Sequence, residues 1–261
     1  MSVNGSVQCA GSDDWEMYQF FVEPFQIQDK KVIITGSDVN HMRNVLRLKT
    51  GEEIAVRCSG DDKEYRCGIE EFAQDQVICS LRFVKEEGVE LPSKIYLFQG
   101  LPKADKMELI VQKAVELGVF EVIPMAVKRC VVKLDEKKAR AKVNRWQGIA
   151  EAAAKQSKRG IIPAVREPMT MKEAAAYARE MEVKLIPYEL AEDMAHTKKI
   201  MESIRPGGRV AVFIGPEGGF EQSEVSEALA AGIEPITLGR RILRTETAGL
   251  TVLSWLMYHL E

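Results

Sequence analysis

The chain is poor in the residues that build metal centres. Its 261 residues contain three histidines and five cysteines (Cys9, Cys58, Cys67, Cys79 and Cys130), and no two cysteines form a Cys-x-x-Cys pair. No zinc-ligand spacing can be assembled from this set, so we expect no metal site. An odd number of unpatterned cysteines also favours a reducing, cytoplasmic setting over a disulfide framework.

Long apolar runs are absent as well. The longest, residues 248–260, contains 13 residues and is interrupted by Thr251, Ser254 and His259, whereas a membrane span needs about 20. Residues 1–15 are polar and lack the basic start and apolar core of a signal peptide. We therefore expect a soluble protein with no membrane partner.

Excess charge of either sign is missing overall but present locally. The formal net charge is −3, yet residues 128–159 hold eleven basic residues against three acidic ones. This local excess of +8 leaves −11 for the rest of the chain. One interpretation is a long, solvated amphipathic helix. The other is a positively charged surface for phosphates, which the strong segregation of charge makes about as plausible.

The first third of the chain predicts a small β-barrel over residues 17–88, preceded by a disordered extension at residues 1–16. Short apolar runs separated by turn signals are typical of such barrels. The expected strands are 17–22, 31–35, 53–58, 65–72 and 77–84. One helix interrupts them, with Ser37 as its N-cap, and it carries His41, Arg43 and Arg47. Residues 85–92 are expected to form a linker.

From residue 92 to 261 the pattern changes to alternating strands and helices. The expected strands are 95–98, 120–124, 183–186, 209–214 and 234–238, and a long basic helix is expected at 136–158. Two pairs have capping-box spacing: Asp105 with Glu108, opening a helix that ends at Gly118, and Thr170 with Glu173, opening one that runs to residue 180. This alternation predicts an α/β fold, a parallel sheet with helices on both faces.

Two glycine-bearing loops follow late strands. They are Gly215-Pro216-Glu217-Gly218-Gly219-Phe220 and the segment from Leu238 to Gly249. Neither is a dinucleotide-binding or phosphate-loop motif. Ligands of open α/β sheets bind past the carboxyl ends of strands, so both loops should line one crevice. The adjacent glycines permit positive φ and close backbone approach to a ligand.

The second loop concentrates positive charge. Arg240, Arg241 and Arg244 lie within five residues, and Thr245 is a candidate cap for the helix that carries Glu246. Arginines at a strand end and a helix N-terminus suit anionic groups. The alternative is a set of surface ion pairs with nearby glutamates, each worth little.

Together these segments resemble the RsmE family of SPOUT-class RNA methyltransferases. The matching motifs are residues 20–22, 41–48, 109–118, 145–146, 151–157, 214–220 and 238–249, in the family's order. The resemblance implies an N-terminal PUA-like β-barrel and a C-terminal SPOUT domain, at 92–261, whose chain threads a deep trefoil knot. It also implies a homodimer, S-adenosylmethionine as methyl donor, and methylation at N3 of one uridine in the 16S rRNA of the small ribosomal subunit.

The resemblance also assigns residues. Cofactor contacts would fall on Pro187, Tyr188, Glu189, Ile214, Gly215, Pro216, Glu217, Gly218, Leu238, Gly239, Ile242, Leu243, Thr245, Thr247 and Ala248. The basic stretch at 128–159, the arginine-bearing face of the first helix and the second loop are where we expect RNA, with contacts to His41, Arg43, Arg47, Lys128, Arg129, Arg145, Lys155, Lys158, Arg159, Arg240 and Arg241. Uracil N3 must lose a proton before it is a nucleophile, so Arg244 is the candidate to stabilise the anion, and Glu217 and Glu246 are candidate bases.

Three other functions stay open at this point. The first is a SPOUT methyltransferase that modifies tRNA at a ribose hydroxyl. The second is an RNA-binding or ribosome-assembly factor without catalysis. The third, a nucleotide-binding regulator, is disfavoured because the phosphate-loop lysine is missing.

Overall fold

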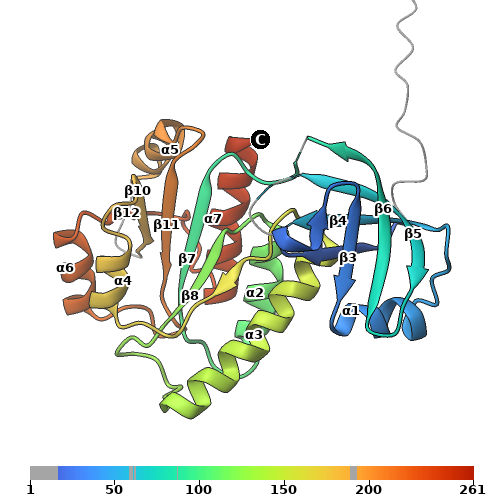
Figure 1. Cartoon of the computed structure of the whole chain (residues 1–261). Helices are drawn as coiled ribbons and strands as arrows, with labels where there is room; N and C mark the ends of the chain where they lie inside the picture. The colour runs from blue at the N-terminus through green and yellow to red at the C-terminus, as the bar shows by residue number, and fades with distance from the viewer. Residues whose placement is uncertain (1–16, 59–60, 62, 87, 189–192) are drawn as a thin grey trace, which may run out of the picture. The chain divides into compact units, whose positions relative to one another are not determined.

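The computed structural model describes residues 17–58, 61, 63–86, 88–188 and 193–261. The predicted extension at 1–16 and the predicted cofactor contact Glu189 lie outside these residues. The chain divides into two compact units, Met1–Val89 and Glu90–Glu261 (Figure 1). Each unit is described by itself below.

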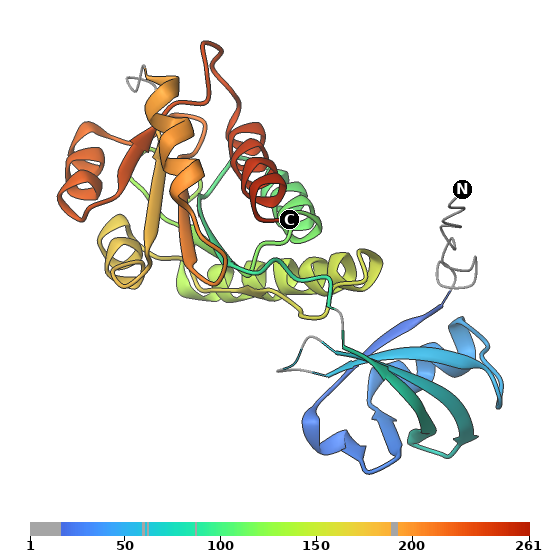
Figure 2. The same cartoon turned by 90° about the horizontal axis from the view of Figure 1, so that it is seen from above.

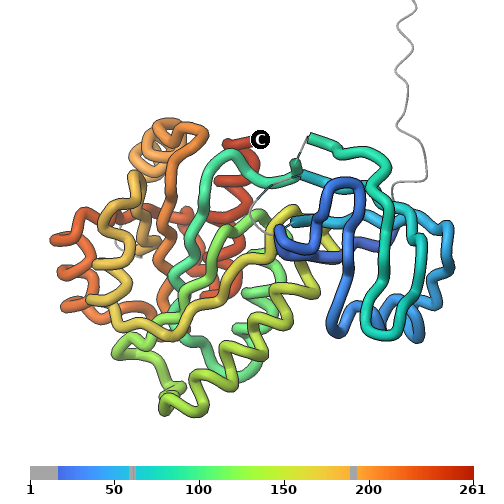
Figure 3. The backbone as a smooth tube through the Cα atoms, viewed as in Figure 1, coloured from blue at the N-terminus to red at the C-terminus, as the bar shows by residue number. Residues whose placement is uncertain are grey.

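Unit 1 is built on one curled sheet (Figure 3). Its strands are β1 (Gln19–Val22), β2 (Ile27–Gln28), β3 (Lys31–Thr35), β4 (Glu53–Cys58), β5 (Glu64–Phe72) and β6 (Gln76–Lys85). They are ordered β1-β4-β5-β6-β3-β2, and only the pairing of β1 with β4 is parallel. Because β1 and β2 remain as edges, the described strands form a half-barrel.

The inner face of this sheet holds the core of unit 1. In β3, Val32 and Ile34 are buried while their neighbours along the strand are more exposed, the period of two that a one-sided sheet requires. Ile54 and Val56 of β4 are fully buried against them. A short 3₁₀ turn, η2 (Pro24–Gln26), joins β1 to β2.

The predicted helix of unit 1 is present, but its cap is not Ser37. The segment comprises α1 (Ser37–Asn40) and a π-helical turn, η3 (His41–Val45). Gly36 occupies the N-cap position with φ of 76°, a conformation that glycine adopts without strain, and Ser37 is the first helical residue. Met42 enters the core and His41 stays exposed.

Unit 2 is a six-stranded sheet in which every pairing is parallel. The strands are β7 (Lys94–Gly100), β8 (Glu121–Met125), β9 (Ala164–Val165), β10 (Val183–Pro187), β11 (Arg209–Ile214) and β12 (Glu234–Ile236), in the order β12-β10-β11-β7-β8-β9. The helices are α2 (Lys106–Glu116), α3 (Glu136–Gln156), α4 (Met171–Tyr177), α5 (Met194–Ser203), α6 (Gln222–Ala230) and α7 (Thr245–Leu260). The α/β prediction is confirmed.

Helices cover both faces of this sheet (Figure 2). Helix α7 packs on β7 and β11 and is flanked by α2, which in turn carries α3, while α4 and α6 pack together near β8 and β12. The central strands are buried on both faces, and the rings of Phe98 and Phe213 stack with centroids 4.4 Å apart. This core fixes the strand ends that carry the two glycine loops.

One of the two predicted capping boxes forms. The Thr170 hydroxyl accepts from the backbone N–H of Glu173, and the Thr170 N–H donates to the Glu173 carboxylate; this box opens α4, which ends at Tyr177 and not at residue 180. The pair Asp105 and Glu108 was predicted wrongly. Asp105 stands at the N-cap of α2 without a side-chain cap: the Glu108 N–H donates to the Asp105 backbone carbonyl at 3.0 Å, and the Glu108 carboxylate pairs with Arg145 of α3 at 2.8 Å.

Candidate active site and family

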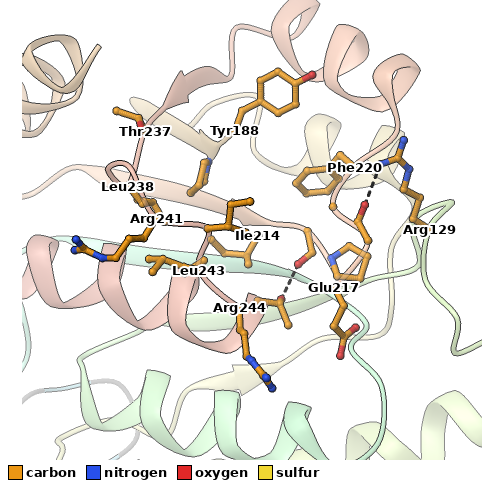
Figure 4. A pocket seen from close by; sticks show the side chains of 18 of the residues that line it. Arg129, Tyr188, Ile214, Glu217, Phe220, Thr237, Leu238, Arg241, Leu243 and Arg244 are labelled. Carbon is orange, nitrogen blue, oxygen red and sulfur yellow. Dashed lines mark hydrogen bonds between the residues drawn. The ribbon is translucent and has the colours of Figure 1, made fainter. Parts of the chain in front are cut away.

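The carboxyl ends of β10, β11 and β12 meet around one pocket of about 1400 Å³ (Figure 4). Pro187, Ile214 and Thr237 line it from these three strand ends, and Leu243 and Ala248 line it from the approach to α7. Parallel strands end at the same edge of a sheet, which is why loops distant in sequence share this pocket.

Most of the predicted cofactor contacts line the pocket. They are Pro187, Tyr188, Ile214, Gly215, Pro216, Glu217, Gly218, Leu238, Gly239, Ile242, Leu243, Thr245 and Ala248. Thr247 does not line it; this residue is exposed on the first turn of α7. Among the candidate catalytic residues, Arg244 and Glu217 line the pocket and Glu246 does not.

Several lining residues were not named from sequence as site residues. Lys106, Met194 and Gln222 each open a helix that follows a strand, and Gln222 accepts a hydrogen bond from the Tyr188 hydroxyl at 3.0 Å. Arg129, Arg240 and Arg241, assigned to RNA, also line the pocket. Applying the strand-end rule to every strand–helix connection would have identified Lys106, which follows β7.

The first glycine loop folds tightly on itself. Gly219 has φ of 67°, and its N–H donates to the Pro216 carbonyl at 2.8 Å. A Cβ atom on Gly215 would lie 3.1 Å from the Gly219 Cα, so the loop backbone would have to shift to admit it. The Arg129 guanidinium donates to the Gly218 carbonyl at 2.9 Å. The loop therefore presents backbone groups to the pocket in a fixed arrangement.

Thr245 joins the two loops and does not cap α7. Its hydroxyl donates to the Gly215 carbonyl at 2.6 Å and accepts from Gln99 Nε2 at 2.8 Å. Arg244 takes the N-cap position, without a side-chain cap. The prediction of Thr245 as a cap was wrong because the hydroxyl is buried between β7 and the first loop, where these partners outcompete its own helix.

The carboxylates near the pocket converge on one lysine. Lys106 Nζ lies 3.0 Å from Glu217 Oε1 and 3.4 Å from Glu246 Oε2. Burial alone would raise the pKa of Glu217, but hydrogen bonds from Lys106 and backbone N–H groups outweigh it and lower that pKa. The hydrogen bond to Glu217 in turn raises the pKa of Lys106. Glu217 is thus ionised at neutral pH and is a weaker base than a free glutamate.

The three arginines of the second loop are exposed. Within the described part of the chain, Arg240, Arg241 and Arg244 make no side-chain hydrogen bond or ion pair. The side chains of Arg244 and Glu217 both extend toward the lower side of the view in Figure 4. The alternative of surface ion pairs with glutamates is therefore wrong for these arginines, whose positive charge remains uncompensated beside the pocket.

Several basic side chains of residues 128–159, unlike these three arginines, are bonded within the fold. Arg159 is 4% exposed, donates to the carbonyls of Val115 and Val119, and pairs with Glu90. It is therefore not available for RNA, contrary to prediction. Lys128 bonds Glu221 and Ser223, and Arg145 bonds Glu108. Lys155 and Lys158 are half-buried.

The predicted RNA contacts of unit 1 lie on or just after the π-helical turn. His41, Arg43 and Arg47 are all exposed. Arg43 bonds the Ala73 carbonyl and lies over the ring of Phe72, 5.7 Å from its centroid. Arg47 has φ of 57°, so the chain leaves the helical path there and the two arginines do not share one helix face.

In residues 17–261, apart from those not described, no group of three histidine, cysteine, aspartate or glutamate side chains could hold a metal ion. No helix among the described residues is both long enough and apolar enough to cross a membrane.

Two family models match the chain. The RNA methyltransferase domain matches residues 89–257, and the RNA methyltransferase PUA domain matches residues 34–81. The first covers the strands, the pocket and α7, and the second covers most of the half-barrel.

Similar proteins agree with these matches. The chain is 37% identical to ribosomal RNA small subunit methyltransferase E of Bacillus subtilis, covering 94% of this chain and 98% of that protein. Its counterpart in Mesomycoplasma hyopneumoniae is 32% identical, covering 91% and 98%. The crystal structure of the Neisseria gonorrhoeae protein of that name, bound to S-adenosylmethionine, superposes with a TM-score of 0.76 at 31% identity, covering 91% and 96%. The resemblance drawn from the motifs is confirmed: the chain belongs to the family of ribosomal RNA small subunit methyltransferase E.

Proposed function

We propose that this protein methylates 16S rRNA of the small ribosomal subunit, with S-adenosylmethionine as donor and N3 of one uridine as acceptor. The observation that carries the proposal is the strand-end pocket in a chain of this family, edged by Arg240, Arg241 and Arg244, which make no ion pair within the described residues. Relatives are named for ribosomal RNA methylation, and one was solved with the donor bound.

The residues of the pocket suit that donor. Ile214, Leu238 and Leu243 offer apolar walls for a flat adenine, and the folded loop from Gly215 to Gly219 offers backbone amides and carbonyls for its polar edge. When bound, S-adenosylmethionine supplies a methyl group on a positively charged sulfur. We assign the lining residues named above as its contacts.

The acceptor nitrogen determines what the remaining residues must do. Uracil N3 bears a proton, and its lone pair takes the methyl group only after that proton leaves. The negative charge then spreads over O2 and O4, where a fixed cation lowers the barrier. Arg244 fits this role because its guanidinium is exposed beside the pocket and makes no ion pair in the described chain.

Glu217 and Glu246 remain the candidate bases, although Glu217 is a poor one. The lowered pKa of Glu217 makes it a weak proton acceptor, so we place the larger contribution on stabilisation of the uracil anion by Arg244. The target base must leave its stack to reach the pocket. Exposed cations such as Arg240 and Arg241 would hold the phosphates around it.

The finer features implied by the family belong to this proposal. We assign residues 17–88 as an RNA-binding domain and 92–261 as the catalytic domain, whose chain we expect to thread a trefoil knot. We also expect a homodimer, acting in the cytoplasm where ribosomal subunits are assembled. Sedimentation of the purified protein at twice the 29.3 kDa chain mass would support the dimer.

The deciding experiment uses small subunits from a strain that lacks this gene. Incubation with methyl-labelled S-adenosylmethionine, followed by mass mapping of the RNA, should place the label on N3 of a single uridine in 16S rRNA. Label on tRNA, or on a ribose hydroxyl, would instead favour the alternative SPOUT activity. Calorimetry that detects no binding of S-adenosylmethionine would favour a non-catalytic assembly factor.

A further inference from the structure

Three segments of unit 2 meet at the side chain of Lys106. This lysine is the first residue of α2, just after β7, and lines the pocket. Its Nζ reaches Glu217 of the first loop at 3.0 Å and Glu246 of α7 at 3.4 Å. The three side chains are 29%, 27% and 17% exposed. Because all three are partly shielded from solvent, these pairs are screened less than surface ion pairs.

The two carboxylates fix different parts of the pocket wall. Glu217 also accepts from the backbone N–H of Lys103, with distances of 3.1 and 3.3 Å to its two oxygens. The first loop is thereby tied to the segment that precedes α2. Glu246 lies in the first turn of α7, two residues after Arg244. A lysine that holds both carboxylates therefore also fixes the turn that presents Arg244.

The contact of Lys106 with the two carboxylates also has an electrostatic effect on the pocket. Two carboxylates beside a pocket in which an anion must form would oppose that anion, and Lys106 offsets part of their charge. Further cations that line the pocket are Arg129, Arg240, Arg241 and Arg244. Burial raises the pKa of the Cys130 thiol, and Glu224 and Glu217 add smaller effects in the same direction.

We propose that Lys106 is a positioning residue for methyl transfer. It clamps Glu217 and Glu246 together, sets the spacing of the two glycine loops and the position of Arg244, and keeps both carboxylates from acting on the substrate as free negative charges. The inference rests on the proposed function, since it names a residue that supports the same site.

The test compares Lys106→Met with Lys106→Arg, and uses Lys113→Met as a matched control. Lys113 lies on the same helix, pairs only locally with Glu116 and does not line the pocket. In single-turnover assays on small subunits, Lys106→Met should slow methyl transfer about tenfold, whereas Lys106→Arg should stay within about threefold because it keeps the charge. S-adenosylmethionine affinity, measured by calorimetry without RNA, should weaken only a few-fold in Lys106→Met.

A double-mutant cycle separates action through the carboxylates from direct action on the substrate. In a Glu217→Gln/Glu246→Gln background, Lys106→Met should cost about twofold or less, because residues in one network are not additive. A full tenfold cost in that background would mean that Lys106 contacts the substrate itself, which contradicts the proposal. Wild-type rates for Lys106→Met would contradict it as well.

The pH dependence of S-adenosylmethionine binding gives a readout that a purely structural lysine would not move. The carboxylate form of Glu217 accepts the Lys103 N–H, so protonation should loosen the first loop and weaken binding. With Lys106 present the pKa of Glu217 is lowered, and affinity should persist into acid. In Lys106→Met, fewer hydrogen bonds oppose the effect of burial on the pKa of Glu217, so S-adenosylmethionine affinity should be lost at a higher pH than in the wild type. If both proteins lose affinity at the same acid pH, the proposed role of Lys106 is contradicted.

The role of Lys106 and the proposed function can be refuted separately. If the wild-type protein transfers methyl groups to 16S rRNA and Lys106→Met does so equally well, only the role of Lys106 is refuted. If the wild-type protein neither binds S-adenosylmethionine nor methylates rRNA, the proposed function falls, and the positioning role falls with it.

Discussion

The second glycine loop and the basic helix α3 look alike in sequence, because both concentrate positive charge. In the structure they differ. Arg240, Arg241 and Arg244 make no side-chain ion pair within the described residues, whereas cations of the α3 region hold the fold together. Arg159 anchors Glu90, and Arg145 joins α3 to α2. A cation that the fold pairs internally is less available to a ligand, and counting charges cannot reveal which cations are paired.

The sharpest contrast is at Arg159, where a mutation should affect folding and not RNA. Removing one partner of a buried ion pair typically costs about 3–5 kcal/mol, so we expect Arg159→Met to lower the free energy of unfolding by about that amount. Urea denaturation measures it, and Arg140→Met on the exposed face of α3 is the control. Unchanged stability of Arg159→Met would break the comparison by showing that this arginine does not hold the fold.

Arg244 should behave in the opposite way. Loss of its charge removes a group that acts on the uracil anion, so Arg244→Ala should slow methyl transfer by about two orders of magnitude. Calorimetry should find S-adenosylmethionine affinity largely intact and denaturation an unchanged fold. Arg179→Ala, an exposed arginine remote from the pocket, controls for net charge. Undiminished turnover would remove Arg244 from the mechanism.

Between these extremes lie the half-buried lysines at the end of α3. Reversing Lys155 and Lys158 to glutamate should weaken rRNA binding about tenfold at low salt, with a shallower salt dependence, because phosphate contacts release counterions. S-adenosylmethionine affinity should not change. A filter-binding titration that gives equal RNA affinity for the variant would remove this end of α3 from the RNA surface.

The smallest effect is expected at Thr245, which joins the two loops without carrying charge. Thr245→Val removes the hydrogen bond to the Gly215 carbonyl and leaves that group unpaired, a cost of about 1–3 kcal/mol when buried. We expect the low end of this range, seen as a several-fold loss of S-adenosylmethionine affinity in calorimetry. Thr245→Ser keeps the hydroxyl and should bind like the wild type; equal affinity for both variants would mean that the bond does not shape the pocket.

Much of the fold could be predicted because its signals are local. The strands at 31–35, 53–58 and 209–214 were bounded correctly, since each is a short apolar or alternating run between turn signals. The capping box of Thr170 and Glu173 also formed. Strand-end reasoning placed the two glycine loops in one pocket, and the family motifs named most of its lining.

The wrong or missing predictions share one cause: these polar side chains bond groups that lie far from them in the sequence. Glu108 pairs with Arg145 and not with its own helix, and Thr245 bonds Gly215 and Gln99. Lys106 went unnoticed because its carboxylate partners lie more than a hundred residues away. Each of these side chains carries a charge or a hydroxyl that can bond several kinds of group, and a helix end is only one of them.

The sequence by itself determined the apolar periodicity, the order of strands and helices, and the family, because these depend on residues close together in the chain. Tertiary structure alone decided which charged side chains pair within the fold and which remain available to a ligand. The reason is that hydrogen bonds and ion pairs act over a few ångströms in space. Only the folded sheet brings Lys106, Glu217 and Glu246 within that reach, while Arg244 makes no ion pair with any residue that the structure describes.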